Sequence, residues 1–220
     1  EMRTPLASII GFLETISSSA KDDIEATKKF LSIIEKEALR MKRLLDDLLI
    51  ITKIESDEHV HPTKKVDLLN TLEIVENNFE QSLKKNNISI EKVYDDKNLY
   101  VLGNQDELIQ VFSNIIENSI KYANENSKIR IKLRILEDKN KDNSVNRLFQ
   151  YNYAIIELID ESEGIPKKHL HRLTERFYRV DKARSKDKGG TGLGLTIVKH
   201  ILNKHLSLIH ISEPTRRYEI

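Results

Sequence analysis

The sequence Gly189-Gly190-Thr191-Gly192-Leu193-Gly194-Leu195 places four glycines directly before an amphipathic run, residues 196–205. Glycine lets backbone N–H groups approach an anion closely, and a helix N-terminus adds unpaired N–H groups and the positive end of its dipole. The pattern therefore predicts a phosphate-binding loop. The alternative is a flexible glycine-rich hinge, because short glycine patterns also occur by chance. Two upstream stretches, 114–122 and 160–165, carry residue types that a nucleotide site also needs.

The composition describes a soluble globular chain with one or two domains. The 220 residues are 39% hydrophobic, and 36 Lys+Arg against 35 Asp+Glu leave a formal net charge of +1, which does not favour nucleic acid or an anionic membrane. The lack of cysteine excludes disulfides and thiolate chemistry and fits a reducing compartment. No apolar run approaches the ~18 residues of a membrane span, and no signal peptide is evident. Because the chain opens on Glu1, we expect a fragment.

Residues 1–55 predict a helical hairpin. Apolar residues recur at helical spacing in the first 20 residues, and a heptad pattern runs through a second helix expected over residues 24–54, about 45 Å long. The first stripe comprises Leu6, Ile9, Ile10, Leu13 and Ile16, and the second comprises Leu31, Ile34, Ala38, Met41, Leu45 and Leu48. The shorter helix cannot cover both apolar edges of the longer one. We therefore expect a homodimeric four-helix bundle, with packing onto the C-terminal half of the same chain as the alternative.

A polar linker, 56–65, leads into a mixed domain, 66–208. Its histidines, His59 and His61, have no third ligand nearby, so we expect solvated side chains rather than a metal site. Periodicity then predicts helices and strands in an α+β sandwich. The expected helices are 68–83 and 106–123, the strands are 88–94, 99–102, 129–135 and 153–159, and a polar loop covers 137–147.

Two upstream stretches carry candidate chemistry. Asn114, Asn118 and Lys121 share one face of the 106–123 helix, and amide oxygens beside a lysine suit Mg²⁺ bound together with phosphates. A solvated polar face is the alternative. Asp160 follows an apolar strand, where its carboxylate can accept a hydrogen bond from an adenine amino group at the rim of an apolar pocket, or simply cap a turn.

A cation-rich segment, 176–188, separates Asp160 from the glycine loop. We expect a mobile lid in which Arg176 and Arg179 contact the outer phosphates of a triphosphate. A plain solvated loop is the alternative for residues 182–188.

Five segments in order resemble the sequence boxes of sensor histidine kinases. They are Glu1-Met2-Arg3-Thr4-Pro5-Leu6, residues 114–122, residues 160–165, Arg176-Phe177-Tyr178-Arg179-Val180-Asp181 and Gly190-Thr191-Gly192-Leu193-Gly194-Leu195, and the resemblance covers about residues 1–205. It implies a dimerising phosphotransfer hairpin followed by an α/β sandwich that binds ATP and Mg²⁺. It also implies a response regulator as partner and, for the whole protein, a bacterial inner-membrane anchor with this part in the cytoplasm.

The resemblance also implies roles for individual residues. Glu1 would be an acid/base partner beside the phosphoacceptor, Thr4 would position water during dephosphorylation of the regulator, and Arg179 would approach the γ-phosphate. Asn118 and Asn114 would hold Mg²⁺, and Asp160 would bind adenine. The remaining nucleotide contacts implied are Lys121, Tyr122, Gly164, Ile165, Arg176, Gly190, Thr191, Gly192, Leu193 and Gly194.

The sequence departs from the family pattern in three places. The phosphoacceptor would precede Glu1, so we expect this fragment to bind ATP without phosphorylating itself by the family route. Ser162 stands where the family has glycine; if the site needs positive φ, the strain of about 1–2 kcal/mol predicts ATP affinity five- to thirty-fold lower. Residues 209–220 form an atypical tail, and 207–216 resembles translated sequencing-adaptor sequence, so we expect an artefactual C-terminus and a less stable sheet. At most, Leu208 to Ile211 would form one strand.

The sequence therefore predicts the core of an ATP-dependent histidine kinase. It would phosphorylate a histidine just upstream of Glu1 and pass the phosphoryl group to a response-regulator aspartate. The alternatives are an ATPase of the gyrase or MutL type with the same nucleotide fold, and a degenerate signalling module that only dimerises.

Overall fold

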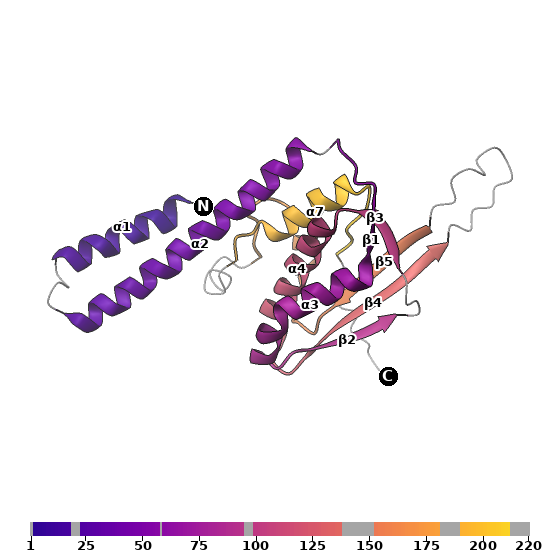
Figure 1. Cartoon of the computed structure of the whole chain (residues 1–220). Helices are drawn as coiled ribbons and strands as arrows, with labels where there is room; N and C mark the ends of the chain where they lie inside the picture. Colours follow the sequence, from indigo (N-terminus) through magenta and orange to yellow (C-terminus); the bar gives the residue numbers. More distant parts are fainter. Residues whose placement is uncertain are drawn as a thin grey trace. The chain divides into compact units, whose positions relative to one another are not determined.

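A computed structural model describes residues 2–18, 23–57, 59–94, 99–137, 152–180 and 190–211 (Figure 1). The chain divides into two compact units. The first comprises Glu1–His59 with His171–His200, and the second comprises Val60–Leu170 with Ile201–Ile220. The two units are described separately below.

The first unit begins with the predicted helical hairpin, made of α1 (Arg3–Ser18) and α2 (Ile24–Ser56). Asp23 caps α2, because its carboxylate accepts a hydrogen bond from the Ala26 backbone N–H at 2.9 Å. The rings of Phe12 and Phe30 stack with centroids 5.4 Å apart, which fixes the two helices side by side. Both predicted helices are confirmed.

Much of the apolar surface of the hairpin is exposed. On α1 the residues Leu6, Ile10 and Leu13 are 46%, 48% and 46% exposed. On α2 the predicted heptad residues Leu31 and Leu45 are also exposed, as is Ile24, one heptad before Leu31. The 33 residues of α2 extend for about 50 Å, whereas α1 has only 16 residues. The shorter helix therefore leaves an apolar stripe of the longer one uncovered.

A different face of α2 is buried. It carries Arg40, Leu44, Ile51 and Ile54. The segment His171–His200 completes the unit and contributes buried Leu173, Leu193, Ile197 and Val198. This second face lies beside the predicted heptad seam, so α2 is apolar on more than one side.

The second unit contains two small sheets. One pairs β1 (Lys64–Asp67) with β3 (Tyr100–Gly103) in antiparallel fashion. The other has the order β2-β4-β5, with β2 (Ser89–Tyr94) parallel to β4 (Lys128–Glu137), and β4 antiparallel to β5 (Asn152–Ile159). This mixed pairing, together with the two long helices, confirms the predicted α+β class.

Helices α3 (Leu68–Lys85) and α4 (Gln105–Tyr122) supply the apolar core beneath the larger sheet. Leu83 of α3 is buried with Ile88 and Ile129, and Ile120 of α4 packs against the same cluster. On β4, Ile129, Ile131 and Leu133 are buried, as the period-two pattern of the strand requires. The short helix α5 (Lys167–Leu170) follows β5, and α7 (Gly194–Lys204) comes last.

Three expectations need correction or lie outside the described residues. The polar linker ends earlier than predicted, because Lys64 already pairs with Gly103 in β1. Residues 207–211 form no strand, and Leu208 is 92% exposed. Most of the predicted 137–147 loop and residues 212–220 of the tail lie outside the described residues.

Candidate functional site

The polar face of α4 carries the first group of candidate residues. Asn104 starts the helix, because its side-chain oxygen accepts hydrogen bonds from the backbone N–H groups of Asp106 at 3.0 Å and Glu107 at 3.3 Å. Two acidic residues in the first turn and Lys121 in the last complement the helix dipole. The side of α4 that packs on the core is apolar, and the candidate residue Asn114 is buried as well.

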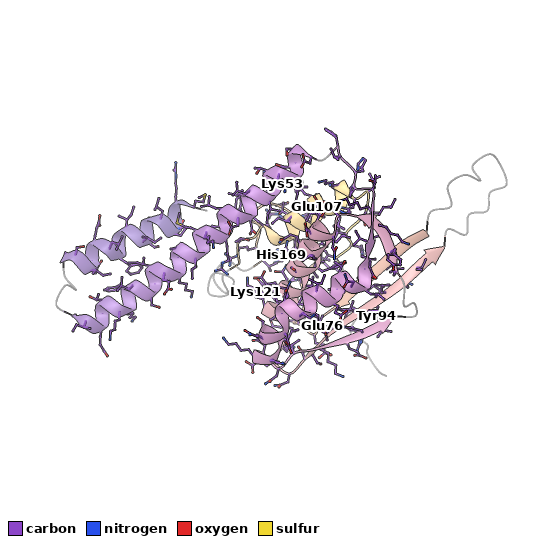
Figure 2. All side chains as sticks on the ribbon, viewed as in Figure 1. Lys53, Glu76, Tyr94, Glu107, Lys121 and His169 are labelled. Atoms are coloured by element: carbon purple, nitrogen blue, oxygen red, sulfur yellow. The ribbon has the colours of Figure 1, made fainter. Side chains whose placement is uncertain are left out.

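Asn114 and Asn118 lie one turn apart on α4. Asn114 is only 9% exposed, and its oxygen accepts a hydrogen bond from Nε2 of Gln110 at 3.1 Å. An amide oxygen has two lone pairs and can accept a second interaction. The ammonium of Lys121 lies 5.9 Å from the ring centroid of Tyr122, at the C-terminal end of α4 (Figure 2). The amide oxygens of Asn114 and Asn118 fit Mg²⁺ held mainly by phosphates, because Mg²⁺ takes few protein ligands and keeps several waters.

The C-terminal end of α4 meets the loop that follows β5. Ala123 and Ser162 form an isolated antiparallel bridge, and the Asn124 N–H donates to the Glu161 carbonyl at 3.0 Å. These bonds bring the 160–165 loop to the helix end that carries Lys121. Two of the three sequence stretches assigned to the nucleotide are therefore neighbours within the second unit.

In the 160–165 loop the positive φ angle belongs to Gly164 and not to Ser162, where the sequence analysis considered it. Gly164 has φ +77°, whereas Ser162 is not among the described non-glycine residues with positive φ. The Ser162 hydroxyl accepts a hydrogen bond from the Gly164 N–H at 3.3 Å. Ser162 therefore stabilises the turn without backbone strain, and the expected loss of ATP affinity through such strain has no structural basis.

The glycine loop belongs to the first unit and adopts a conformation that requires glycine. Gly192 has φ +76°, and a Cβ there would lie 2.9 Å from the backbone carbon of Phe177. Its carbonyl accepts the Phe177 N–H at 2.9 Å, and Phe177 itself has φ +62°. Leu193 is fully buried and precedes the first turn of α7. This close approach of two backbones explains the glycine at position 192.

Other candidate residues have varied environments. Thr4 is exposed in the first turn of α1, Ile165, Arg179, Gly190 and Gly194 are half-buried, and the Arg176 side chain is 47% exposed. Glu1 and residues 181–189 of the predicted lid lie outside the described residues. His61 is exposed, as expected for a solvated linker residue, and its Nδ1 also lies 2.9 Å from the Lys204 carbonyl.

Sequence reasoning missed two acidic partners on α2. Asp47 accepts a hydrogen bond from the Thr191 hydroxyl at 2.7 Å, and Glu55 forms an ion pair with Arg176. Both acids lie in a helix rich in surface charges, so nothing in their spacing distinguishes them from solvated residues.

The described part of the chain offers neither a metal-binding cluster nor a membrane-spanning helix. It contains no group of three or more acidic or histidine side chains that could hold a metal ion, and none of its helices has the length and apolar content needed to cross a bilayer. One hollow, lined by Val93, Lys132, Leu133, Arg134 and Glu157, lies on the larger sheet away from the candidate residues.

Comparisons with known proteins agree with this arrangement. The model of the His Kinase A (phospho-acceptor) domain matches residues 1–57, and that of the histidine kinase-, DNA gyrase B-, and HSP90-like ATPase matches residues 103–220, more than half of the chain. The chain therefore belongs to the histidine kinases. Within that class, its matched segments are the phospho-acceptor hairpin and the ATPase domain.

Individual relatives support the same family. The chain is 32% identical over 205 residues to sensor histidine kinase WalK of Bacillus subtilis, covering 93% of this chain and 31% of the relative. It is 34% identical over 214 residues to the phosphate regulon sensor protein PhoR of Pseudomonas aeruginosa, covering 96% and 44%. The chain thus spans less than half the length of these relatives.

Solved structures share the fold. Histidine kinase AdeS of Acinetobacter baumannii superposes with a TM-score of 0.62 at 23% identity, covering 93% of this chain and 86% of that chain. Histidine kinase ThkA, solved in complex with response regulator protein TrrA, gives a TM-score of 0.62 at 24% identity and covers 81% and 48%.

Proposed function

We propose that this chain is the core of an ATP-dependent protein histidine kinase in two-component signalling. The observation that carries the proposal is the bonded contact between the end of α4 and the 160–165 loop, made by Asn124 and Glu161. It joins a helix bearing two amides and a lysine to a loop bearing Asp160. Phosphoryl transfer asks a protein mainly for positioning and charge neutralisation, which these groups supply.

The chain's own residues would divide the work as follows. Asn118 and Asn114 bind the metal-bound triphosphate, Asp160 accepts a hydrogen bond from the adenine amino group, and the 190–194 loop cradles phosphate. Arg176 and Arg179 neutralise charge at the outer phosphates. Mg²⁺, when bound, shields and orients the triphosphate oxygens. The contacts of Lys121, Tyr122, Gly164 and Ile165 complete the nucleotide site.

We propose as acceptor a histidine just upstream of Glu1 in the whole protein. Glu1 acts as its acid/base partner, and Thr4 orients water when the regulator is dephosphorylated. The phosphoryl group then passes to an aspartate of a response regulator. One structural relative, ThkA, was solved with such a regulator, which supports this choice of partner.

The exposed heptad positions support a homodimer. Ile24, Leu31 and Leu45 are spaced in multiples of seven along α2, and each is at least 45% exposed. A second copy of the hairpin would bury them in a four-helix bundle. We further propose that the whole protein is anchored in the bacterial inner membrane by a part outside this chain, with this core in the cytoplasm.

A phosphotransfer assay tests the proposal. A chain carrying histidine immediately before Glu1 is incubated with Mg²⁺ and γ-labelled ATP. We expect label that is stable in base and labile in acid, absent when glutamine replaces that histidine. Steady ATP hydrolysis without labelled protein would favour the gyrase or MutL type of ATPase. No adenine-nucleotide binding at millimolar concentration would favour a module that only dimerises.

A further inference from the structure

Polar contacts join α2 to the other part of the first unit, His171–His200. Residues His171–His200 belong to the same compact unit as the hairpin, and two acids of α2 reach them. Asp47 and Glu55 are eight residues apart, which corresponds to roughly 12 Å along a helix. Both contact residues that the proposed function assigns to phosphate, namely Thr191 and Arg176.

The Thr191 hydroxyl is engaged on both sides. It donates to Oδ2 of Asp47 at 2.7 Å and accepts the backbone N–H of Leu193 at 3.2 Å. The Leu193 N–H is one of the groups that a phosphate-binding loop would turn toward an anion. In this conformation the loop satisfies that donor itself, and α2 holds the hydroxyl that satisfies it.

Glu55 makes the second contact between α2 and the 171–200 segment. Its Oε1 pairs with the guanidinium of Arg176 and lies 3.7 Å from Nε2 of His200 on α7. The Arg176 and Glu55 side chains are 47% and 35% exposed. Because water can solvate both partners, the ion pair is weak, and Arg176 can leave Glu55 for a competing anion. A single carboxylate thus contacts both the segment before the glycine loop and the helix after it.

The backbone around the loop is held in the same state. Phe177, the neighbour of Arg176, donates its N–H to the Gly192 carbonyl at 2.9 Å. The Thr196 hydroxyl donates to the Thr174 carbonyl at 3.1 Å. Because of these two hydrogen bonds, a displacement of the 174–177 segment also displaces the glycine loop and the start of α7.

We propose that Asp47 and Glu55 form a latch on α2 that holds the glycine loop and Arg176 in a state opposed to nucleotide binding. This inference rests on the proposed function. A triphosphate would compete with Glu55 for Arg176 and would be repelled by both carboxylates. Because coupling between sites is reciprocal, bound nucleotide must weaken the hold of α2 by the same factor. Movement of α2 then provides a direct route from the hairpin to the nucleotide.

Calorimetric titration of the full chain with AMPPNP and Mg²⁺ tests the latch. The variants are Asp47→Asn, Glu55→Gln and the double variant, and Asp46→Asn is the matched control because it removes the same charge from an exposed neighbour. We expect two- to fivefold tighter binding for each single variant and about tenfold for the double. Asp46→Asn should leave affinity within twofold. ADP should show smaller gains than AMPPNP, because it carries less charge.

Hydrogen exchange without nucleotide gives an independent readout. Peptides covering 190–198 should exchange faster in Asp47→Asn and Glu55→Gln than in Asp46→Asn. Thr191→Val should reproduce the effect of Asp47→Asn, and Thr191→Ser should retain wild-type protection. Circular dichroism melts identify any variant that has merely unfolded. If Asp47→Asn is unfolded, Thr191→Val takes its place in the comparison.

The outcomes separate the two claims. Unchanged or weaker AMPPNP binding in folded Asp47→Asn and Glu55→Gln would overturn the latch while leaving nucleotide binding intact. A wild-type chain that binds no nucleotide would overturn the proposed function. In that event, unchanged exchange over 190–198 in the variants would also overturn the restraint by α2.

Discussion

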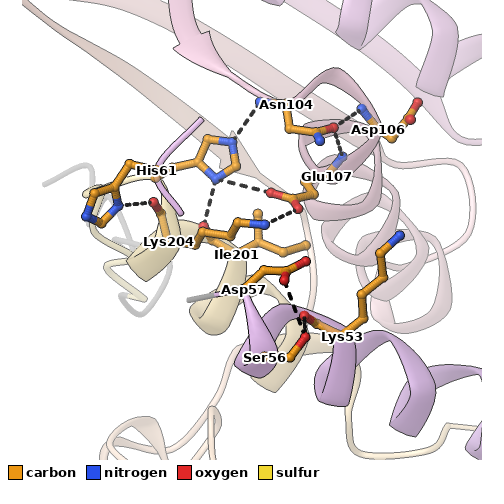
Figure 3. Close-up of polar contacts among 10 residues, drawn as sticks. Lys53, Ser56, Asp57, His61, Asn104, Asp106, Glu107, Ile201 and Lys204 are labelled. Carbon is orange, nitrogen blue, oxygen red and sulfur yellow. Dashed lines mark hydrogen bonds and ion pairs between the residues drawn. The ribbon is translucent and has the colours of Figure 1, made fainter. Parts of the chain in front are cut away.

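The backbone N–H of Asn104 donates a hydrogen bond to Nε2 of His205, 3.0 Å away, and so links the start of α4 to the end of α7 (Figure 3). The other ring nitrogen lies 2.8 Å from the Ile201 carbonyl. Beside this bond, Nζ of Lys204 contacts Oε1 of Glu107 at 2.7 Å. The His205 side chain is only 4% exposed, and its ring joins the start of α4 to the end of α7.

Removing this link should destabilise the second unit. His205→Ala deletes a buried ring and its two hydrogen bonds, which we expect to lower the free energy of unfolding by about 1–3 kcal/mol. Gly103→Ala should act in the same direction, because its Cβ would lie 3.0 Å from Leu108 and 3.3 Å from the His205 ring. Urea unfolding measures both, with exposed His210→Ala as control. Equal stability of the His205 and His210 variants would contradict the assignment.

Alkaline pH should weaken the fold through Tyr94 and Lys92. Burial raises the pKa of Tyr94 above its ordinary value of 10.0, and the hydrogen bond from Lys92 to Glu76 raises the lysine pKa above 10.5 (Figure 2). In both cases the unfolded chain loses its proton first. The stabilisation is therefore complete below about pH 10 and declines as pH rises through the folded-state values.

Melting temperatures between pH 9 and 11.5 test this dependence. Tyr94→Phe keeps the ring and removes its titration, so the variant should lose less stability than the wild type over this range. The matched change Tyr100→Phe alters a side chain that is 46% exposed and should follow the wild-type curve. Parallel curves for Tyr94→Phe and wild type would contradict the role of the half-buried phenol.

Asn118 should be essential for magnesium-dependent nucleotide binding. Asn118→Ala removes the amide oxygen that we propose as a ligand of the metal-bound triphosphate, and we expect Mg²⁺–ATP affinity to fall roughly ten- to hundredfold. Exposed Glu117→Gln, one residue away, is the control. Calorimetry with and without Mg²⁺ measures the effect. A loss that is the same in the absence of Mg²⁺ would argue against a metal-binding role.

Two glycine substitutions should have opposite effects. Gly192→Ala forces a Cβ against the Phe177 backbone at φ +76° and should destabilise the first unit by about 1–3 kcal/mol while weakening ATP binding. Gly11→Ala lies in α1 with nothing within 4 Å of the new Cβ, and should stabilise the hairpin by about 0.5–1 kcal/mol. Thermal melts compare them; stabilisation by both would refute the strain at position 192.

Charge on the exposed stripe should prevent self-association. Leu31→Asp with Leu45→Asp places carboxylates on the heptad face that we propose as the dimer interface, where they would be buried without partners. Light scattering after size exclusion should give the mass of a monomer for this variant and of a dimer for the wild type. Leu102→Asp, on a side chain 66% exposed in β3, should remain dimeric. A monomeric wild type would refute the dimer.

The long helices could be predicted because their physical cause is local. α4 carries a capping asparagine, acidic residues in its first turn and a continuous apolar face, all visible in sequence. β1 could not be predicted in this way, because only four residues with one buried valine form it, and its partner Gly103 is 39 positions from Lys64. Long-range pairing of so short a strand leaves no periodic pattern to detect.

The candidate site shows the same division. The residue types at Asn118, Asp160 and Gly192 could be identified in the sequence, and the positive φ of Gly192 agrees with a glycine-specific role. The partners of the loop could not be identified, because Asp47 gains its role only through a tertiary contact with Thr191. The predicted backbone strain at Ser162 could not be judged from the sequence either, because the identity of a residue does not define its φ angle.

The hydrogen bond between His61 and the Lys204 carbonyl ties the start of the second unit to the end of α7. Only three residues separate His61 from Asp57, the C-cap of α2. Inserting residues next to His61 should therefore also disturb the end of α7, although the two bonded residues lie 143 positions apart in the sequence.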